Sequence, residues 1–369
     1  MKKILTSISV VIITIVLFMN CDDSGITEGE YQIKYLREQQ LTNIFNNEII
    51  VLSTLFSSET EKLSSEIENF KTNTTLDNLT KTRNSWVNVL KIWKRLELYN
   101  LGAVENSFIH FEINRWPTNT TLINKYIDGV AIMNEAFVTT KGSSSKGISA
   151  IEYLLYSDVN QQKVRTSFIT SPNNARRLDY LLALSKNLES KAVQLKNMWN
   201  IDKSNFISSI ENGTSGSQNQ LTNALISIIE EIIIKKLGNP LGNTSGGKVN
   251  IEKLEAYRSE TSLGILQEHL TVLKRCFLGS FKEKSIKWGY DNYLTLIGNE
   301  TITPKVLEAF EIIQQNINSI NGSLKNELLS NPDKIVKLRQ KFTDLLVLIK
   351  VDLANTIGAT VTISDNDGD

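Results

Sequence analysis

The stretch Leu178-Asp-Tyr-Leu-Leu-Ala-Leu-Ser-Lys-Asn-Leu-Glu-Ser-Lys-Ala-Val-Gln-Leu-Lys-Asn-Met-Trp199 repeats apolar or small residues at three- and four-residue steps. This spacing predicts an amphipathic α-helix, because an α-helix completes a turn every 3.6 residues. The same spacing recurs in the segments 35–65, 77–100, 218–237, 251–278, 310–320 and 335–353. Strand-like alternation is nearly absent, with 359–363 as an expected short extended tail, so the sequence predicts an all-α fold.

Helix starts and breaks divide the chain. Three of the five prolines follow a residue that commonly caps a helix, which predicts that each proline takes the first helical position. They are Pro172 after Ser171, Pro304 after Thr303 and Pro332 after Asn331. Two Gly-containing stretches, 212–216 and 238–247, predict breaks, and the first separates two helical halves. We therefore expect an N-terminal helical bundle over 33–205 and a C-terminal helical bundle over 206–369.

The first twenty residues have the pattern of a lipoprotein signal peptide. Lys2 and Lys3 precede an apolar run that is short for a membrane span and ends at Asn20-Cys21-Asp22-Asp23. We expect cleavage after residues 1–20, a lipid on Cys21 and a polar tether over 21–32. The alternative is an uncleaved anchor helix. A lipid on Cys21 would attach the chain to the bacterial cell envelope, at the outer membrane, where it faces the periplasm or the cell surface.

Charge and composition limit the function classes. The chain has 40 basic and 40 acidic residues, and this zero net charge gives no electrostatic reason to expect nucleic acid as a partner. Hydrophobic residues make up 41% and charged residues 22%, as in ordinary globular proteins. With two Cys and two His, a metal site has to rely mainly on carboxylates. Cys276 is expected to be a buried apolar residue.

Common catalytic signatures are missing from the chain. There is no His-Glu-x-x-His zinc helix, no Gly-x-Ser-x-Gly nucleophile turn and no P-loop. We expect His269 to lie on a helix face. His110, in an irregular aromatic stretch before Trp116-Pro117, is a weaker candidate for a metal ligand, with a packed structural role as the alternative.

The most informative segment is Lys146-Gly-Ile-Ser-Ala-Ile-Glu-Tyr-Leu-Leu-Tyr156, in which Ser149 and Glu152 share one helix face. It resembles the imelysin family, whose hallmark is Gly-x-His-x-x-Glu followed by an aromatic residue and leucines. Further matches follow in order along the chain: Trp86, Trp93, Glu97, Gly102, Arg115-Trp116-Pro117, Lys236-Leu-Gly-Asn-Pro-Leu241, Ser259-Glu-Thr-Ser262 and Asp365-Asn-Asp-Gly-Asp369.

The resemblance implies two related four-helix-type bundles in an exported, often lipid-anchored protein. The imelysin family is associated with iron or other metal acquisition, and some of its members are classed as metallopeptidases. The resemblance also implies a ligand-binding cleft formed by Glu97, Trp116, Gly147, Ser149 and Glu152. Ser149 stands where the family has His, and a hydroxyl is a poor substitute for imidazole as a transition-metal ligand.

A carboxylate pair of Glu97 and Glu152 would favour a hard cation such as iron(III), calcium or magnesium. The alternative is structural: both carboxylates cap backbone N–H groups or pair with Arg95 or Arg115. The tail 365–369 ends before a calcium loop is complete and is expected to be a solvated acidic terminus.

These observations favour a lipid-anchored envelope protein of the imelysin-like group that binds a metal ion, most simply iron, or a small ligand, without catalysis. An envelope protein partner is a further expectation. Two alternatives remain: a metal-dependent peptidase, and a scaffold that binds a partner protein or a polysaccharide. Exposure of Trp116 and its neighbours would favour the scaffold.

Overall fold

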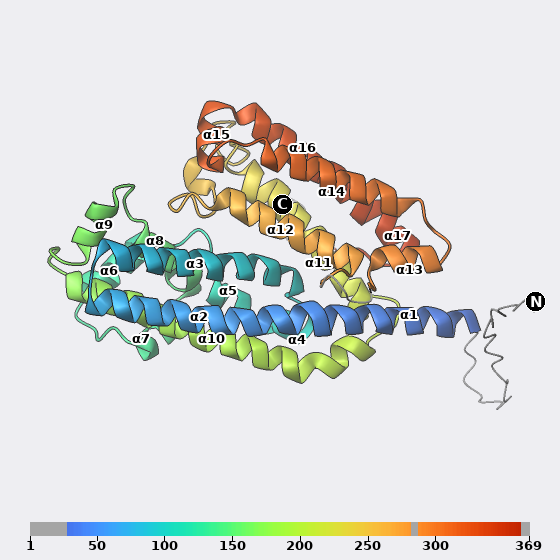
Figure 1. Cartoon of the computed structure of the whole chain (residues 1–369), viewed down its shortest axis with the longest axis horizontal. Helices are drawn as coiled ribbons and strands as arrows, with labels where there is room; N and C mark the ends of the chain where they lie inside the picture. The colour runs from blue at the N-terminus through green and yellow to red at the C-terminus, as the bar shows by residue number, and fades with distance from the viewer. Residues whose placement is uncertain (1–27, 282–286, 363–369) are drawn as a thin grey trace, which may run out of the picture.

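The computed structural model describes residues 28–281 and 287–362, and within them the chain is all-α, as predicted. Figure 1 shows the long helices in two layers. The longer helices are α1 (Glu28–Ile44), α2 (Ile50–Thr72), α3 (Leu76–Leu96), α10 (Asn174–Ser208), α11 (Ser217–Glu231), α12 (Ser262–Leu278), α14 (Ile302–Asn318) and α16 (Pro332–Val347). The first four belong to one layer and the last four to the other (Figure 1).

Shorter helices connect the long ones. They are α4 (Gly102–Asn106), α5 (Ile109–Ile113), α6 (Thr120–Asp128), α7 (Glu135–Thr139), α8 (Gly147–Leu155), α9 (Gln161–Ser167), α13 (Tyr290–Leu296), α15 (Leu324–Ser330) and α17 (Ala354–Ile357). Turns of 3₁₀ geometry are η2 (Glu97–Tyr99), η3 (Ser143–Ser145) and η5 (Ile251–Lys253). Single π-helical turns are η1 (Phe45–Ile49), η4 (Ile232–Gly238) and η6 (Leu348–Leu353).

Apolar stripes on α2, α3 and α10 form the core of the first layer. Trp93 of α3 packs on Phe56 of α2 with ring centroids 5.5 Å apart, and Trp199 of α10 packs on Phe45 at 6.2 Å. Thr75 caps α3 by accepting a hydrogen bond from the Asn78 backbone N–H at 3.2 Å. The buried apolar side chains continue from this layer into the second as one cluster, so the two layers share a core.

Several predicted helix bounds are wrong. In the segment predicted as helical over 251–278, the α-helix begins only at Ser262, because Ala256 and Glu260 adopt left-handed backbone conformations in the turn before it. Pro332 takes the first position of α16 as predicted. α10 starts two residues after Pro172, and α14 starts two residues before Pro304.

The predicted division at 205/206 falls in the last turn of α10, which ends at Ser208 before a turn leads into α11. The division into domains stays a prediction. Of the expected extended tail over 359–363, residues 359–362 are neither helix nor strand, and the Thr360 backbone N–H donates to Asn219 Oδ1 at 2.6 Å. The signal peptide, Cys21, most of the tether and the acidic tail 365–369 lie outside the described residues.

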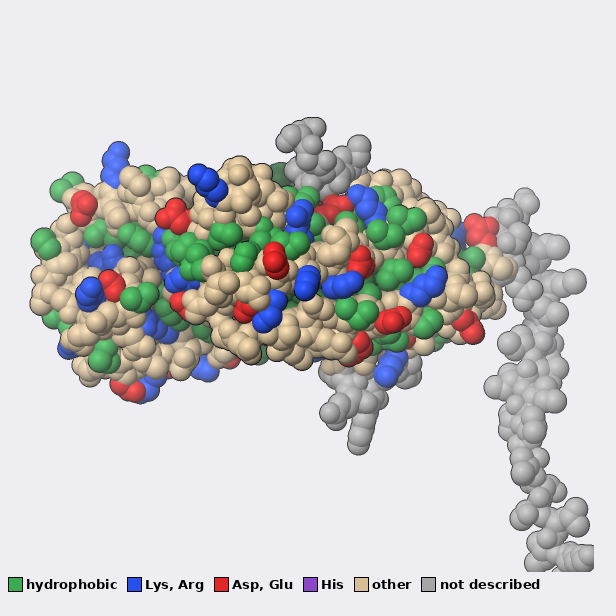
Figure 2. All heavy atoms as spheres, turned by 90° about the horizontal axis from the view of Figure 1, so that it is seen from above, with side chains coloured by type: hydrophobic (Ala, Val, Ile, Leu, Met, Phe, Trp, Pro, Cys, Tyr) green, Lys and Arg blue, Asp and Glu red, His purple; other side chains and the backbone are tan. Residues whose placement is uncertain are grey.

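The surface of the second layer carries a mixture of side chains. Figure 2 shows apolar, basic and acidic side chains interspersed on this face, with no large area of one charge sign. Across 28–281 and 287–362, no helix combines the length and the apolar character needed to cross a bilayer.

Candidate functional site

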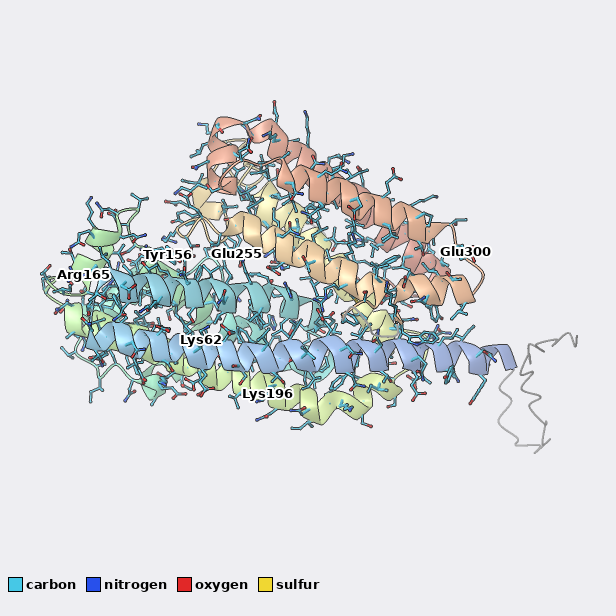
Figure 3. The ribbon with its side chains drawn as sticks, viewed as in Figure 1. Lys62, Tyr156, Arg165, Lys196, Glu255 and Glu300 are labelled. Atoms are coloured by element: carbon cyan, nitrogen blue, oxygen red, sulfur yellow. The ribbon has the colours of Figure 1, made fainter. Side chains whose placement is uncertain are left out.

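A cleft of about 980 Å³ opens beside α3, α5, α11 and η4. Its lining includes three of the predicted site residues, Glu97, His110 and Trp116. Glu255, which precedes α12, also lines it, and Figure 3 shows Glu255 where the two layers meet. The cleft is therefore formed by segments that lie far apart in the sequence.

Buried ion pairs lie beside the cleft and involve Glu97, Glu231 and Glu255 of its lining. Lys94 Nζ donates to Glu97 Oε1 at 2.6 Å and to Glu255 Oε1 at 2.7 Å. Lys236 Nζ lies 2.7 Å from Glu255 Oε2 and 2.8 Å from Glu231 Oε1. Lys94 is 0% and Lys236 2% exposed, so both ammonium groups depend on these carboxylates for stabilisation. Each oxygen of Glu255 accepts a hydrogen bond from a different lysine.

The lysines keep these carboxylates ionised despite their burial. Burial alone would raise the pKa of Glu97 and of Glu255. Lys94 and Lys236 outweigh this effect, holding the pKa of Glu97 well below its usual range and lowering that of Glu255 to about 2. Burial likewise works against charge on Lys236, but Glu231 and Glu255 raise its pKa above the ordinary value. The group is thus a charged network at neutral pH.

His269 completes this network from α12. Its Nε2 lies 2.9 Å from Glu97 Oε2, and its side chain is fully buried. Burial lowers the pKa of His269, although the hydrogen bond to Glu97 opposes this. We therefore assign a neutral ring whose Nε2–H donates to the ionised Glu97. His269 lies on a face of α12, as predicted, but its place in this network was not predicted, although it lies on the same apolar stripe as Ile265, Val272 and Cys276.

The Gly147 segment fixes α8 against α5. Gly147 forms an isolated antiparallel bridge with Asn114 and has φ +74°, a conformation that favours glycine. A Cβ at this position would lie 2.2 Å from the Ile113 carbonyl oxygen. Trp86 Nε1 also donates to the Ile148 carbonyl at 3.0 Å. Gly147 is thus required by backbone conformation and close packing, and it does not line the cleft.

Ser149 reaches the ion network through one intermediate residue. Its hydroxyl donates to Asn114 Oδ1 at 2.7 Å, and Asn114 Nδ2 donates to Glu255 Oε1 at 3.1 Å. The residue that replaces the motif histidine therefore orients Asn114 toward the buried carboxylate.

Glu152 holds the turn before α12. Its Oε1 accepts hydrogen bonds from the Ser259 backbone N–H at 2.9 Å and from the Ser259 hydroxyl at 2.8 Å. Burial raises its pKa, and the two bonds from Ser259 lower it by less. This matches the structural alternative for Glu152, a carboxylate that binds a backbone N–H. Glu97 also has a structural partner, but the partner is Lys94 and not one of the two expected arginines.

Those arginines are engaged elsewhere. Arg95 donates to Glu268 Oε2 at 2.6 Å, and the Arg115 guanidinium lies 4.6 Å from the centre of the Phe111 ring.

The motifs, the all-α layers and the cleft agree with a family comparison. The family model described as Imelysin matches residues 54–350. The chain belongs to the imelysin family. No curated protein matches the chain.

Two solved structures have a similar fold. An imelysin-like protein from Psychrobacter arcticum 273-4 superposes with a TM-score of 0.73 at 18% identity, covering 89% of this chain and 98% of that one. A protein assigned as an iron-regulated protein A precursor, from Parabacteroides distasonis ATCC 8503, superposes with a TM-score of 0.69 at 16% identity, covering 90% and 97%.

The residues of this imelysin do not fit a resident metal ion. No group of three His, Cys, Asp or Glu side chains among the described residues is placed to hold one. Glu97 accepts from Lys94 and His269, while Glu152 accepts from Ser259. The structure thus does not bring Glu97, Glu152 and His110 together as one ligand set, and the two lysines occupy the carboxylates that would neutralise a cation.

Aromatic side chains line the remaining wall of the imelysin cleft. The His110 ring centroid lies 3.9 Å from that of Phe111, and burial lowers the pKa of His110. Trp116 is half-buried and Phe111 is 36% exposed. The aromatic groups predicted to mark a binding surface are therefore partly accessible at the cleft.

Proposed function

We propose that this imelysin is a lipid-anchored binding protein of the bacterial cell envelope that assists iron or other metal uptake without catalysis. Support comes from family membership and from a structural neighbour assigned as an iron-regulated protein. In this proposal the metal is cargo carried in the cleft, and the lipid on Cys21 attaches the chain to a membrane.

One observation favours binding over catalysis: both oxygens of Glu255 are engaged by the ammonium groups of Lys94 and Lys236. A metallopeptidase needs protein ligands that hold an ion and leave one position for the attacking water. Lysine ammoniums on the central carboxylate oppose such an arrangement, since they supply the positive charge themselves.

The first experiment measures metal content and peptidase activity together. The full chain is purified without chelators, analysed for iron and other metals, and incubated with an unfolded test protein. Because the metal is cargo and not a resident ion, iron is added before the analysis, and we expect it to bind above the level of a control protein treated in parallel, without cleavage. A metal content at background would contradict the metal role. Chelator-sensitive cleavage that Glu152→Gln abolishes would contradict the non-catalytic role.

The second experiment tests the anchor. Mass spectrometry of the membrane-extracted protein is expected to find an acylated Cys21 at the mature amino terminus, and Cys21→Ser should move the protein to the soluble fraction. An intact residue 1–20 segment in the membrane-bound protein would instead support the uncleaved anchor helix.

A further inference from the structure

Three basic side chains of the cleft lining have no acidic partner. They are Arg115 after α5, Lys235 in η4 and Lys253 in η5, here called the basic group. All three are exposed, and in the described part of the chain none of these side chains forms a hydrogen bond or an ion pair. Exposed cations are common on protein surfaces, but these three come from separate segments and line the same concave site.

The segments that carry the basic group meet at Glu255. Asn114 comes directly before the first member of the group and donates to Glu255 Oε1 at 3.1 Å. Lys236 comes directly after the second member and donates to Glu255 Oε2 at 2.7 Å. The third member, Lys253, is two residues before Glu255. The basic group therefore gathers at the Glu255 end of the cleft.

Arg115 is positioned by stacking. Its guanidinium lies 4.6 Å from the centre of the Phe111 ring, and the ring centroid of Phe111 lies 3.9 Å from that of His110. Stacking uses the face of the guanidinium and leaves the N–H donors, which lie in its plane, available to an acceptor. Because this planar set of donors matches the two oxygens of a carboxylate, Arg115 is already oriented to bind one.

The charges at the Glu255 end have a positive excess. The buried network has two lysines, three carboxylates and a neutral histidine, so by itself it carries one negative charge. The basic group adds three positive charges, which leaves an excess of two. A bare metal cation is therefore repelled from this end of the cleft, whereas an anion is attracted to it.

Glu105, an acidic residue of the lining without an ion pair in the described ranges, lies at the opposite end of the cleft. It belongs to α4, and a Cβ at Gly102 of this helix would lie 3.7 Å from Gln220 Oε1, near the start of α11. Lys235 follows the other end of α11, and the helix between Gln220 and Lys235 spans roughly 20 Å. Glu105 is thus too distant to neutralise the basic group.

We propose that the basic group binds a polycarboxylate anion, and that a metal ion carried in this cleft enters as an anionic polycarboxylate complex. Arg115 donates two hydrogen bonds to one carboxylate, and Lys235 and Lys253 contact others. The cleft of about 980 Å³ has room for such a complex. The second statement rests on the proposed function. It gives the metal ligands that this chain does not bring together among its described residues, because the carboxylates of the complex hold the ion.

Titration of the full chain with defined probes tests both statements. Calorimetry compares citrate with triethyl citrate, the neutral ester of the same carbon skeleton, and with iron(II) chloride as the bare cation. We expect triethyl citrate to bind at least about tenfold more weakly than citrate, and added salt to weaken citrate binding severalfold by screening. Equilibrium dialysis against ferric citrate, with iron analysis, measures whether the complex binds together with its metal.

Variants identify the contacts. Arg115→Gln should weaken citrate binding by about tenfold, the effect of losing a charged pair of hydrogen bonds. Lys235→Gln and Lys253→Gln should each weaken it by about threefold, since exposed ion pairs are weaker. The matched controls are Lys305→Gln on α14 and Lys337→Gln on α16, which are exposed and outside the lining, and they should leave the affinity unchanged. Circular dichroism establishes that each variant is folded.

Absence of citrate binding, equal binding of triethyl citrate, or equal losses in the control variants would each overturn the inference. Binding of iron(II) without binding of citrate would overturn it and leave the proposed function in place. Binding of citrate but not of its iron complex would uphold the anion site, and would contradict both the entry of metal as a complex and the metal role.

Discussion

The ammonium group of Lys94 lies 2.7 Å from Oε1 of Glu255, a residue 161 positions later in the chain. This contact joins α3 to the turn before α12, and it is buried on both sides. The two carboxylates that Lys94 contacts belong to different helical layers.

Loss of Lys94 should therefore be costly. We expect Lys94→Met to lower the free energy of unfolding by about 3–5 kcal/mol, because it leaves buried carboxylates without their counterion. Urea denaturation followed by circular dichroism measures this. The control is Lys81→Met, which removes the exposed pair with Asp77 and should change stability far less. Similar effects for the two variants would contradict the role of the buried network.

His269 should make the free energy of unfolding depend on pH. Burial keeps the folded-state pKa of His269 below the unfolded value of 6.5, so the unfolded chain binds the extra proton as pH falls. This contribution to stability is present above pH 6.5 and is lost on acidification. The pKa values of Glu97 and Glu255 are depressed, so their contribution to stability is likewise lost as the pH falls below 4.5.

A variant isolates the histidine contribution. The contribution of Glu48 to stability has the opposite pH dependence, because burial raises its pKa to about 7. Wild type is therefore compared with His269→Gln, in which Glu48 is unchanged. The stability advantage of wild type should shrink by up to about 1.4 kcal/mol per pH unit below 6.5. Urea denaturation at pH 7.5 and 5.5 measures it, and an advantage that grows at pH 5.5 would refute the assignment.

Gly147 should tolerate no side chain. Gly147→Ala combines a left-handed φ of +74° with a Cβ 2.2 Å from the Ile113 carbonyl oxygen, so we expect a loss of more than about 2 kcal/mol. Gly142→Ala is the matched control, because φ is −63° and nothing lies within 4 Å of the added carbon. Thermal unfolding compares the two, and equal melting temperatures would count against the bridge to Asn114.

Restoring the family histidine should not create a metal site. In Ser149→His the imidazole would sit beside Asn114, while Glu255 and Glu97 still accept from Lys94. We expect zinc titration of this variant to match wild type in calorimetry. Tight one-to-one zinc binding by Ser149→His would show that zinc can displace the lysines from the carboxylates, which would contradict the conclusion that these residues do not fit a resident metal.

Ser149→Ala leaves Asn114 Oδ1 unpaired and should lower the free energy of unfolding by about 1–3 kcal/mol.

Local periodicity predicted most of the fold. The stripes through Leu178–Trp199 and Ile335–Leu353 are helical, because burial of one helix face leaves its period in the sequence. Cys276 is buried, as expected. The turn before α12 was not predicted. Its left-handed positions are occupied by Ala256 and Glu260, which are not residue types that indicate a turn.

The site was less accessible to sequence reasoning. Of the five residues that the resemblance placed in a cleft, Glu97 and Trp116 line this one, whereas Gly147, Ser149 and Glu152 do not. The sequence did not predict the roles of Lys94, Lys236 and His269. A buried charged or polar side chain can be identified only together with its partner, and these partners come from distant segments. Glu152 was correctly paired with a backbone N–H in one alternative, but only the fold identifies Ser259 as that partner.

The span between Lys94 and Glu255 also affects how the chain reaches its folded state. The amino-terminal half contains Lys94 and Glu97 but neither Glu255 nor His269. Lys94 can therefore pair with Glu97 inside this half, whereas its second carboxylate belongs to a later segment of the chain. The complete buried network can therefore form only when segments more than 160 positions apart are both present.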